Sequence, residues 1–113
     1  MRFECYEVAL DLIRSLGGPV LRIQQKDKDL AVQIRKAASS VALNLKESSR
    51  RVGKDRTHLL RVAAGAASET MGALDVACAW GHVGEWEVAH SLELCDRIRA
   101  MLHRLVNGKP PRA

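Results

Sequence analysis

Hydrophobic and small residues recur every three or four positions between residues 29 and 69, which is the spacing of one buried face of an α-helix. The first stripe consists of Leu30, Ile34, Ala37, Val41 and Leu45, and the second consists of Leu59, Leu60, Val62, Ala63, Ala66 and Ala67. The segment between them is short and basic, and it contains Gly53 and an aspartate, Asp55, suited to cap the following helix. The pattern predicts two helices that run antiparallel and pack on each other.

A further helical pattern lies on each side of this hairpin, at residues 2–16 and 85–106. The pattern at 2–16 has Phe3, Tyr6, Leu10, Ile13 and Leu16 on its apolar side. Gly17-Gly18-Pro19 is predicted to end it, because glycine frees the backbone and proline cannot continue the hydrogen-bond ladder. Residues 20–26 are then expected to form a short helical or extended link, followed by Asp27 and Asp29 at the start of the second helix.

The predicted helices cover residues 2–16, 28–50, 54–80 and 85–106, followed by a tail at 107–113. Residues 81–84 contain two glycines and separate the last two helices. No strand-like alternation occurs, so the expected architecture is an all-α, antiparallel up-down-up-down four-helix bundle, with residues 1–113 in one domain.

Polar residues lie on or beside the apolar stripes of the central hairpin. If its turn centres near residues 52 and 53, facing positions have numbers that sum to about 105, which predicts three cross-helix pairs. These structural polar pairs are Arg35 with Glu69, Asn44 with Arg61, and Glu47 with His58. Either they meet as charge-assisted hydrogen bonds or individual members point to solvent. Gly65 and Gly72 each cost roughly 1 kcal/mol inside a helix, which favours close approach of a neighbouring helix there.

The fourth helix carries two apolar stripes. One consists of Val88, Leu92, Cys95, Leu102 and Val106, and the other of Leu94, Ile98, Met101 and Leu105. If only one stripe seals the bundle, the other is exposed and marks a partner surface. The expected oligomer interface therefore contains Leu94, Ile98, Met101 and Leu105, with Trp80 and Trp86 as anchors. The alternatives are a deeply buried fourth helix and, for the tryptophans, packing in the core.

Composition narrows the possible functions. The formal net charge is +5 and aromatic residues make up only 4%, which suits binding to phosphate backbones better than stacking on bases. Without a signal-peptide pattern or an apolar run of about 18 residues, the expected location is cytoplasmic. The three cysteines, Cys5, Cys78 and Cys95, are widely spaced and are expected to pack as small hydrophobes.

No catalytic motif is present. The chain lacks a glycine-rich phosphate loop, a nucleophile elbow and cysteine or histidine pairs at zinc spacing, so neither an enzyme nor a cofactor is predicted. Glu87-x-x-His90 matches half of the di-iron motif of helical bundles, but that site needs a second such pair and two more glutamates. We therefore expect no metal site.

Positive charge is concentrated at one end of the predicted bundle. Residues 1–7, 46–61 and 103–113 share that end and hold ten lysines and arginines against four carboxylates, which leaves +6 there and −1 elsewhere. The candidate nucleic-acid-binding residues are Arg50, Arg51, Lys54, Arg56, Arg104 and Lys109. They suit phosphate binding with little sequence preference, although cations at helix ends also improve solubility and complement helix dipoles.

The hairpin resembles the bacterial four-helix-bundle family of 23S rRNA intervening-sequence proteins. The matching residues are Arg35, Ala38, Ser40, Asn44, Glu47 and Arg51, then Arg61, Gly65 and Glu69. The chain departs from the family pattern at Ser48, where glycine is usual, and at Ala66, where serine is usual. The resemblance implies a self-assembling bundle, with pentameric rings among relatives. It also implies a relation to the basic accessory variability proteins of diversity-generating retroelements, which bind nucleic acid and a reverse transcriptase.

These observations together predict a non-catalytic, self-assembling accessory protein that binds RNA or DNA backbones. The alternative is a protein–protein adaptor that docks its partner on the apolar face of the fourth helix. A larger protein such as a reverse transcriptase is an expected partner, and a membrane is not.

Overall fold

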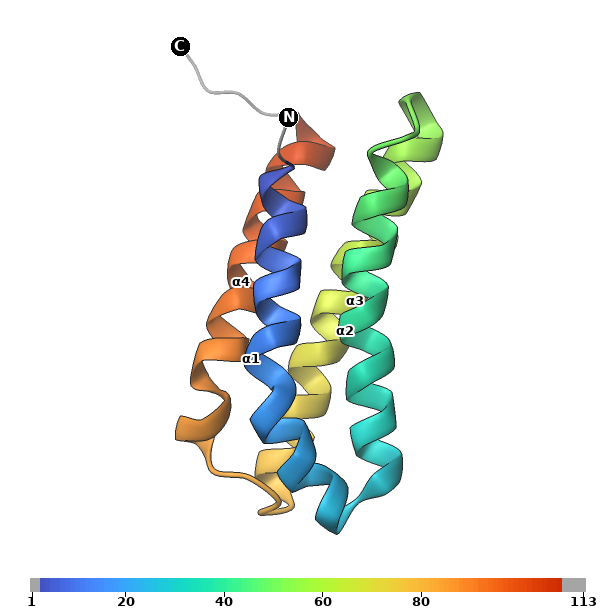
Figure 1. The fold of residues 1–113 in the computed structure, drawn as a ribbon. Coiled ribbons are helices and arrows are strands. Elements are labelled where there is room, and N and C mark those ends of the chain that lie inside the picture. The colour runs from blue at the N-terminus through green and yellow to red at the C-terminus, as the bar shows by residue number, and fades with distance from the viewer. Residues whose placement is uncertain (1–2, 109–113) are drawn as a thin grey trace.

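A computed structural model describes residues 3–108, which form four helices connected by short turns (Figure 1). The helices are α1 (Glu4–Lys26), α2 (Lys28–Ser48), α3 (Gly53–Ala79) and α4 (Glu85–Asn107). Each helix packs against two others, in the order α1, α2, α3, α4 around the bundle, and α4 closes against α1. The predicted all-α four-helix bundle is confirmed. Among the described residues, no helix is long and apolar enough to cross a membrane.

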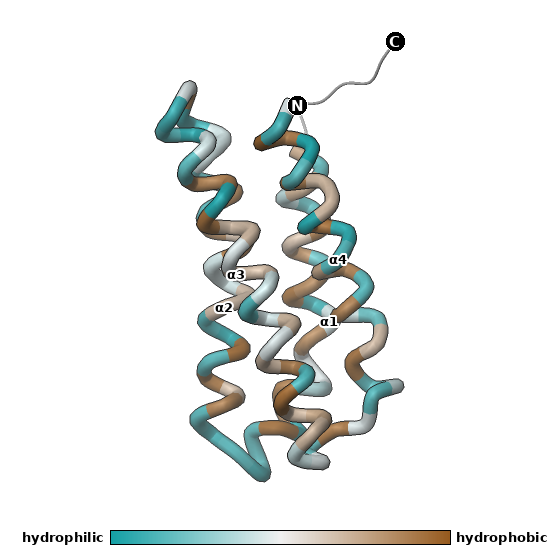
Figure 2. Tube along the Cα trace, turned by 180° about the vertical axis from the view of Figure 1, so that it is seen from behind, coloured by the Kyte–Doolittle hydropathy of each residue, from teal (hydrophilic) through white to brown (hydrophobic). Residues whose placement is uncertain are grey.

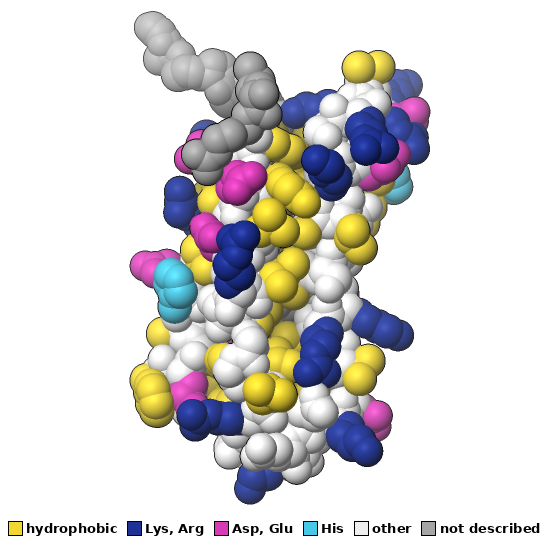
Figure 3. All heavy atoms as spheres, viewed as in Figure 1, with side chains coloured by type: hydrophobic (Ala, Val, Ile, Leu, Met, Phe, Trp, Pro, Cys, Tyr) yellow, Lys and Arg dark blue, Asp and Glu magenta, His cyan; other side chains and the backbone are white. Residues whose placement is uncertain are grey.

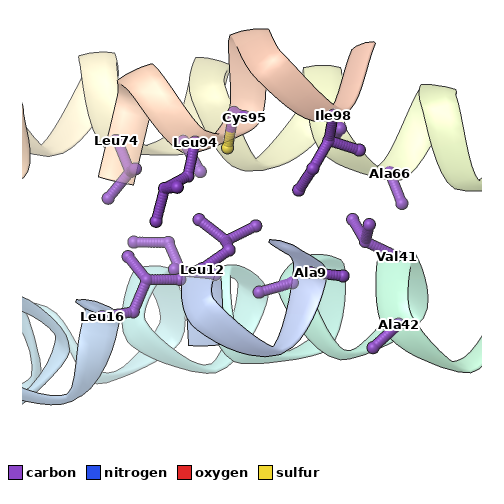
Figure 4. Close-up of a cluster of buried hydrophobic side chains, with 14 of the residues drawn as sticks. Ala9, Leu12, Leu16, Val41, Ala42, Ala66, Leu74, Leu94, Cys95 and Ile98 are labelled. Carbon is purple, nitrogen blue, oxygen red and sulfur yellow. The ribbon is translucent and has the colours of Figure 1, made fainter. Parts of the chain in front are cut away.

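The core lies along the bundle axis and receives side chains from all four helices (Figure 4). Apolar and polar positions alternate along each helix at the helical spacing, as the hydropathy colouring in Figure 2 shows. The largest fully buried side chains are those of Leu12, Ile23, Ile34, Leu45, Leu60, Leu74, Ile98 and Leu102. Each contributes about 1.5–3 kcal/mol on burial, so this core stabilises the fold.

Helix α1 extends ten residues beyond the predicted end at residue 16, and the predicted link at 20–26 does not exist. Pro19 lies inside the helix, where it removes the hydrogen bond to the carbonyl of Ser15. The stripe of buried residues nevertheless continues through Val20 and Ile23, which are 4% and 0% exposed. Burial of these two side chains offsets the missing bond, so tertiary packing outweighs the local glycine and proline signals.

Asp27 separates α1 from α2 with a single extended residue, at φ −155° and ψ 92°. Its backbone N–H donates to the carbonyl of Ile23, and its side chain accepts from the N–H of Leu30 at 3.0 Å. The predicted role of Asp27 as the cap of α2 is confirmed. Asp55, by contrast, does not cap α3, because that helix begins two residues earlier, at Gly53, and Asp55 lies in its first turn.

Both apolar stripes of α4 are largely buried within one chain. Leu94 and Ile98 are 6% and 0% exposed, so the expectation that they face a partner is wrong. Helix α4 packs against both α1 and α3 and therefore needs apolar residues over a wide arc. Of the other predicted interface residues, Met101 is half-buried and Leu105 is partly exposed. Trp80 and Trp86 remain on the surface, at 70% and 79% exposed.

Gly65 and Gly72 do not mark a close approach between helices. Both are exposed, and a Cβ added to either would meet no neighbouring atom within 4 Å outside the local helix backbone. The prediction of tight helix packing at these two positions is therefore wrong. Their cost of roughly 1 kcal/mol each has no compensation inside the protomer.

Candidate nucleic-acid interface

One end of the bundle carries a set of basic side chains that we call the basic pole. The start of α1, the α2–α3 turn and the end of α4 lie at this end, which is uppermost in Figure 1. The pole consists of Arg50, Arg51, Lys54, Arg56 and Arg104, of which Arg56 is half-buried and the others are exposed. Figure 3 shows lysine and arginine side chains gathered over the α2–α3 turn. Lys109, also predicted for this site, lies outside the described residues.

The α2–α3 turn places these side chains by tightening the end of α2. The N–H groups of Arg50 and Arg51 donate to the carbonyls of Glu47 and Ser48, three residues earlier, at 3.0 and 3.1 Å. Gly53 then adopts φ +60°, a conformation that favours glycine, and α3 begins. The chain therefore reverses within four residues and presents adjacent arginines at its outermost point.

Most cations of the basic pole have no carboxylate partner. Arg51 is the exception, because its Nη2 and Nε lie 2.7 and 2.9 Å from Oε2 of Glu47. Within residues 3–108, Arg50, Lys54 and the two other pole arginines form no ion pair. Unpaired cations gathered at one end attract polyanions more strongly than cations neutralised by neighbouring carboxylates.

The three predicted polar pairs do not form. Each member that is hydrogen-bonded uses a partner on its own helix, in the adjoining turn or on α1: Asn44 donates to the carbonyl of Ser40 at 2.8 Å, Glu47 accepts from Arg51, and Arg35 donates to Gln24 at 2.7 Å. The other three, His58, Arg61 and Glu69, are exposed. The positions that face each other across α2 and α3 are occupied instead by buried apolar residues such as Val41 and Ala63. The polar residues consequently flank the contact between α2 and α3.

Two surface grooves between α3 and α4 carry opposite charge. The basic groove, of about 340 Å³, lies toward the basic pole and is lined by Arg61, Ala64, Gly65, Ser68, Arg99, Leu102, His103, Val106 and Asn107. The acidic groove, of about 790 Å³, lies toward the other end and is lined by Asp75, Cys78, Ala79, Glu85, Ala89, Leu92, Glu93 and Asp96. The sequence prediction missed Arg99 and His103, although their spacing of four residues places both on one face of α4.

The cysteines offer no reactive nucleophile in the core. Cys5 and Cys95 are buried, which confirms the expectation that they pack as small hydrophobes, whereas Cys78 is only half-buried. Burial, with a smaller effect of Glu4, raises the pKa of Cys5 to about 11. Burial, with a smaller effect of Asp96, raises the pKa of Cys95 to about 12. Both thiols are therefore protonated at neutral pH, and the thiol is a poor nucleophile.

Glu87 has a structural role in the fold. One oxygen accepts from the backbone N–H of Gly84 at 2.8 Å, which caps α4, and the other lies 2.6 Å from Arg22 on α1. His90, the other member of the half di-iron motif, is exposed and lies 3.6 Å from Glu93. In the part of the chain that the structure describes, no three histidine, cysteine or acidic side chains are grouped to hold a metal ion.

Together, the fold and this surface define an all-α four-helix bundle with a basic end. The profile of the 23S rRNA-intervening sequence protein family matches residues 3–104, and the chain belongs to that family. A crystal structure of a protein of unknown function from the S23 ribosomal protein family of Bacteroides thetaiotaomicron has the same fold. It has a TM-score of 0.82 and 17% sequence identity, and the match covers 90% of this chain and 97% of that one. None of the curated protein sequences matches this chain.

Proposed function

We propose that this protein is a non-catalytic accessory protein that binds the phosphate backbone of RNA or DNA through its basic pole. The observation that carries the proposal is that Arg50, Lys54, Arg56 and Arg104 lie at one end without ion-pair partners among residues 3–108. Backbone binding by such cations releases counterions and needs no base stacking. This agrees with the low aromatic content of 4%.

The test is a salt titration of binding to a generic single-stranded RNA of 20 nucleotides, followed by fluorescence anisotropy. The logarithm of the affinity should fall linearly with the logarithm of the salt concentration, by about 0.7 for each phosphate bound. Replacing Arg50, Arg51, Lys54 and Arg56 by alanine should abolish binding at 0.15 M salt and flatten the slope.

A matched control removes four positive charges elsewhere. Lys26, Lys28, Arg35 and Lys36 are exposed and lie away from the basic pole, so their replacement by alanine changes the net charge equally. This variant should retain most of its affinity. Equal losses in the two variants would show that net charge, and not the pole, attracts RNA. Binding that no salt concentration weakens would contradict the proposal.

We also propose that the protein self-associates, with the pentameric ring implied by the family resemblance as the expected assembly. Leu94 and Ile98 are buried and therefore cannot contact another copy of the chain. The remaining predicted interface residues are Trp80 and Trp86, which flank the α3–α4 turn, and Met101 and Leu105, which lie near the basic pole. Exposed tryptophans are frequent anchors of protein interfaces. A ring would multiply the positive charge of the pole by its copy number and could present it to nucleic acid or to a larger protein such as a reverse transcriptase.

Light scattering coupled to size exclusion tests self-association. The wild-type mass should be a multiple of the 12.5 kDa protomer. Replacing both Trp80 and Trp86 by serine should shift the mass toward the monomer without loss of helicity. A wild-type monomer would refute self-association. The adaptor alternative keeps only Met101 and Leu105 of its proposed surface, because Leu94 and Ile98 of the same stripe are buried.

A further inference from the structure

Gly65 is an exposed glycine in the middle of α3 that no contact within the protomer explains. Its replacement by alanine would meet no neighbouring atom within 4 Å, and alanine is about 1 kcal/mol more favourable in a helix. Gly65 lines the basic groove, where the absence of a side chain leaves the backbone of α3 bare between Arg61 and Ser68. An open groove is therefore the local consequence of having glycine at this position.

The side chains around that opening are suited to hold a polyanion. Arg61 on α3 and Arg99 on α4 line the groove, Ser68 adds a hydroxyl donor, and no aspartate or glutamate lines it. Arg61 forms no ion pair within residues 3–108, whereas Nη1 of Arg99 makes a long ion pair with Asp96, at 3.5 Å, and lies 3.7 Å from the sulfur of Met71. Arg61 is thus free to bind phosphate oxygens, and the pair of Arg99 with Asp96 is solvent-exposed and weak, so a phosphate can compete with the carboxylate for Arg99.

The basic groove is continuous in charge with the basic pole. Lys54, His58, Arg61 and Gly65 are spaced by four, three and four residues, which places them along one face of α3. This row begins at the α2–α3 turn and leads into the groove. At the other end of the α3–α4 contact, four carboxylates (Asp75, Glu85, Glu93 and Asp96) line the acidic groove and repel a polyanion.

We propose that the basic groove binds a segment of a single-stranded phosphodiester backbone, with Arg61 and Arg99 on its phosphates and the strand lying against the bare backbone at Gly65. The half-buried Val106 offers an apolar contact for a ribose. This proposal rests on the proposed function and specifies the path of the strand. The strand continues along α3 to the basic pole, and the acidic groove limits its extension in the opposite direction.

The decisive variant is Gly65→Leu, with Gly72→Leu as its matched control. Both glycines are exposed and lie inside α3, and a Cβ at either meets no neighbouring atom within 4 Å, so we expect both variants to be at least as stable as the wild type. Only Gly65 lines the basic groove. With the same 20-nucleotide RNA at 0.1 M salt, Gly65→Leu should bind about fivefold more weakly for every phosphate that the leucine excludes from the groove. Gly72→Leu should bind as the wild type does.

A second pair of measurements does not depend on how the leucine variants fold. Arg61→Gln and Arg99→Gln should each reduce the salt slope by about 0.7. Arg97→Gln removes the same charge from α4 but outside the groove, where Arg97 lies 3.8 Å from Glu4, and should leave the slope unchanged. Equal effects at Arg97 and Arg99 would overturn the groove proposal.

The outcomes separate this proposal from the function on which it rests. If Gly65→Leu and the two groove arginine variants bind as the wild type while the variant of the basic pole does not bind, the groove is wrong and the pole stands. If the wild type itself fails to bind RNA, both proposals fall.

Discussion

Ser15 and Ser91 join α1 to α4 through a hydrogen bond of 2.7 Å between their hydroxyl oxygens. Ser15 also donates to the carbonyl of Leu12 at 2.6 Å, so Ser91 supplies the hydrogen of the bond between the two serines. The contact lies one turn before Pro19, whose missing N–H leaves the carbonyl of Ser15 without its helical donor. Two helices are therefore linked by side chains at the point where the backbone ladder of α1 is interrupted.

Replacing Ser91 by alanine should destabilise the fold by about 1 kcal/mol, because it deletes this hydrogen bond at a site that is 1% exposed. The midpoint of thermal unfolding, followed by circular dichroism, should fall by about 4 °C. Ser39 is exposed on α2 and serves as the control, since its replacement by alanine should shift the midpoint little. An unchanged midpoint for Ser91→Ala would show that the bond contributes nothing to stability.

Gly18 tests why α1 continues past its predicted end. In the structure it is an exposed helical residue with room for a side chain, so Gly18→Ala should stabilise the protein by about 0.5–1 kcal/mol. A helix-terminating glycine would give the opposite result. Gly53→Ala is the contrasting variant, because Gly53 has φ +60° and alanine there should destabilise by about 1 kcal/mol. Urea unfolding of both variants against the wild type measures the difference.

The positions of the helices followed from the sequence wherever the apolar stripe and the local signals agreed. Asp27 is an example, because capping is a local interaction between a side chain and the next turn. The end of α1 was mispredicted because glycine and proline are weighed locally, whereas burial of Val20 and Ile23 depends on neighbouring helices. The two stripes of α4 were visible in the sequence, but only the packed bundle shows that both are largely buried.

The basic pole could be predicted from topology alone, since antiparallel helices bring distant segments to one end. The pairing of Arg51 with Glu47 follows from a spacing of four residues within α2 and its adjoining turn. The basic groove could not be predicted, because it needs the relative rotation of α3 and α4, which sets Arg61 beside Arg99. Arg61 and Glu69 are exposed on α3, outside its buried contact with α2, which is why two of the three predicted polar pairs failed.

The buried cysteines should make stability fall in alkaline solution. The pKa values of Cys5 and Cys95 are about 11 and about 12 in the folded protein, against 9.0 for an unperturbed thiol. Above pH 9 the unfolded chain therefore releases protons that the folded chain retains, and ionisation favours unfolding. Each cysteine should reduce the free energy of unfolding by about 1 kcal/mol between pH 9 and pH 10.

Urea unfolding at several pH values measures this effect, and the double variant Cys5→Ala, Cys95→Ala is its control. The double variant is expected to be less stable at pH 7, because it loses buried volume, but its stability should depend less on pH above 9. A thiol reagent at pH 8 should modify Cys78 first, since Cys78 is only half-buried. Equally steep pH dependence in the wild type and the variant would contradict the assignment.

Glu87 is expected to stabilise the start of α4 through two separable interactions. Its side chain is 11% exposed, accepts from the N–H of Gly84 and pairs with Arg22. Glu87→Gln keeps an oxygen for the N–H of Gly84 but loses the charge that faces Arg22, whose side chain is 61% exposed, so the cost should be under about 1 kcal/mol. Glu87→Ala loses both interactions and should cost about 1 kcal/mol more than the glutamine variant. Urea unfolding measures the free energy of unfolding of both variants.

Equal losses of this free energy in Glu87→Gln and Glu87→Ala would mean that the capping bond contributes nothing. A larger loss in Glu87→Gln than in Arg22→Gln would show that the carboxylate has a further partner.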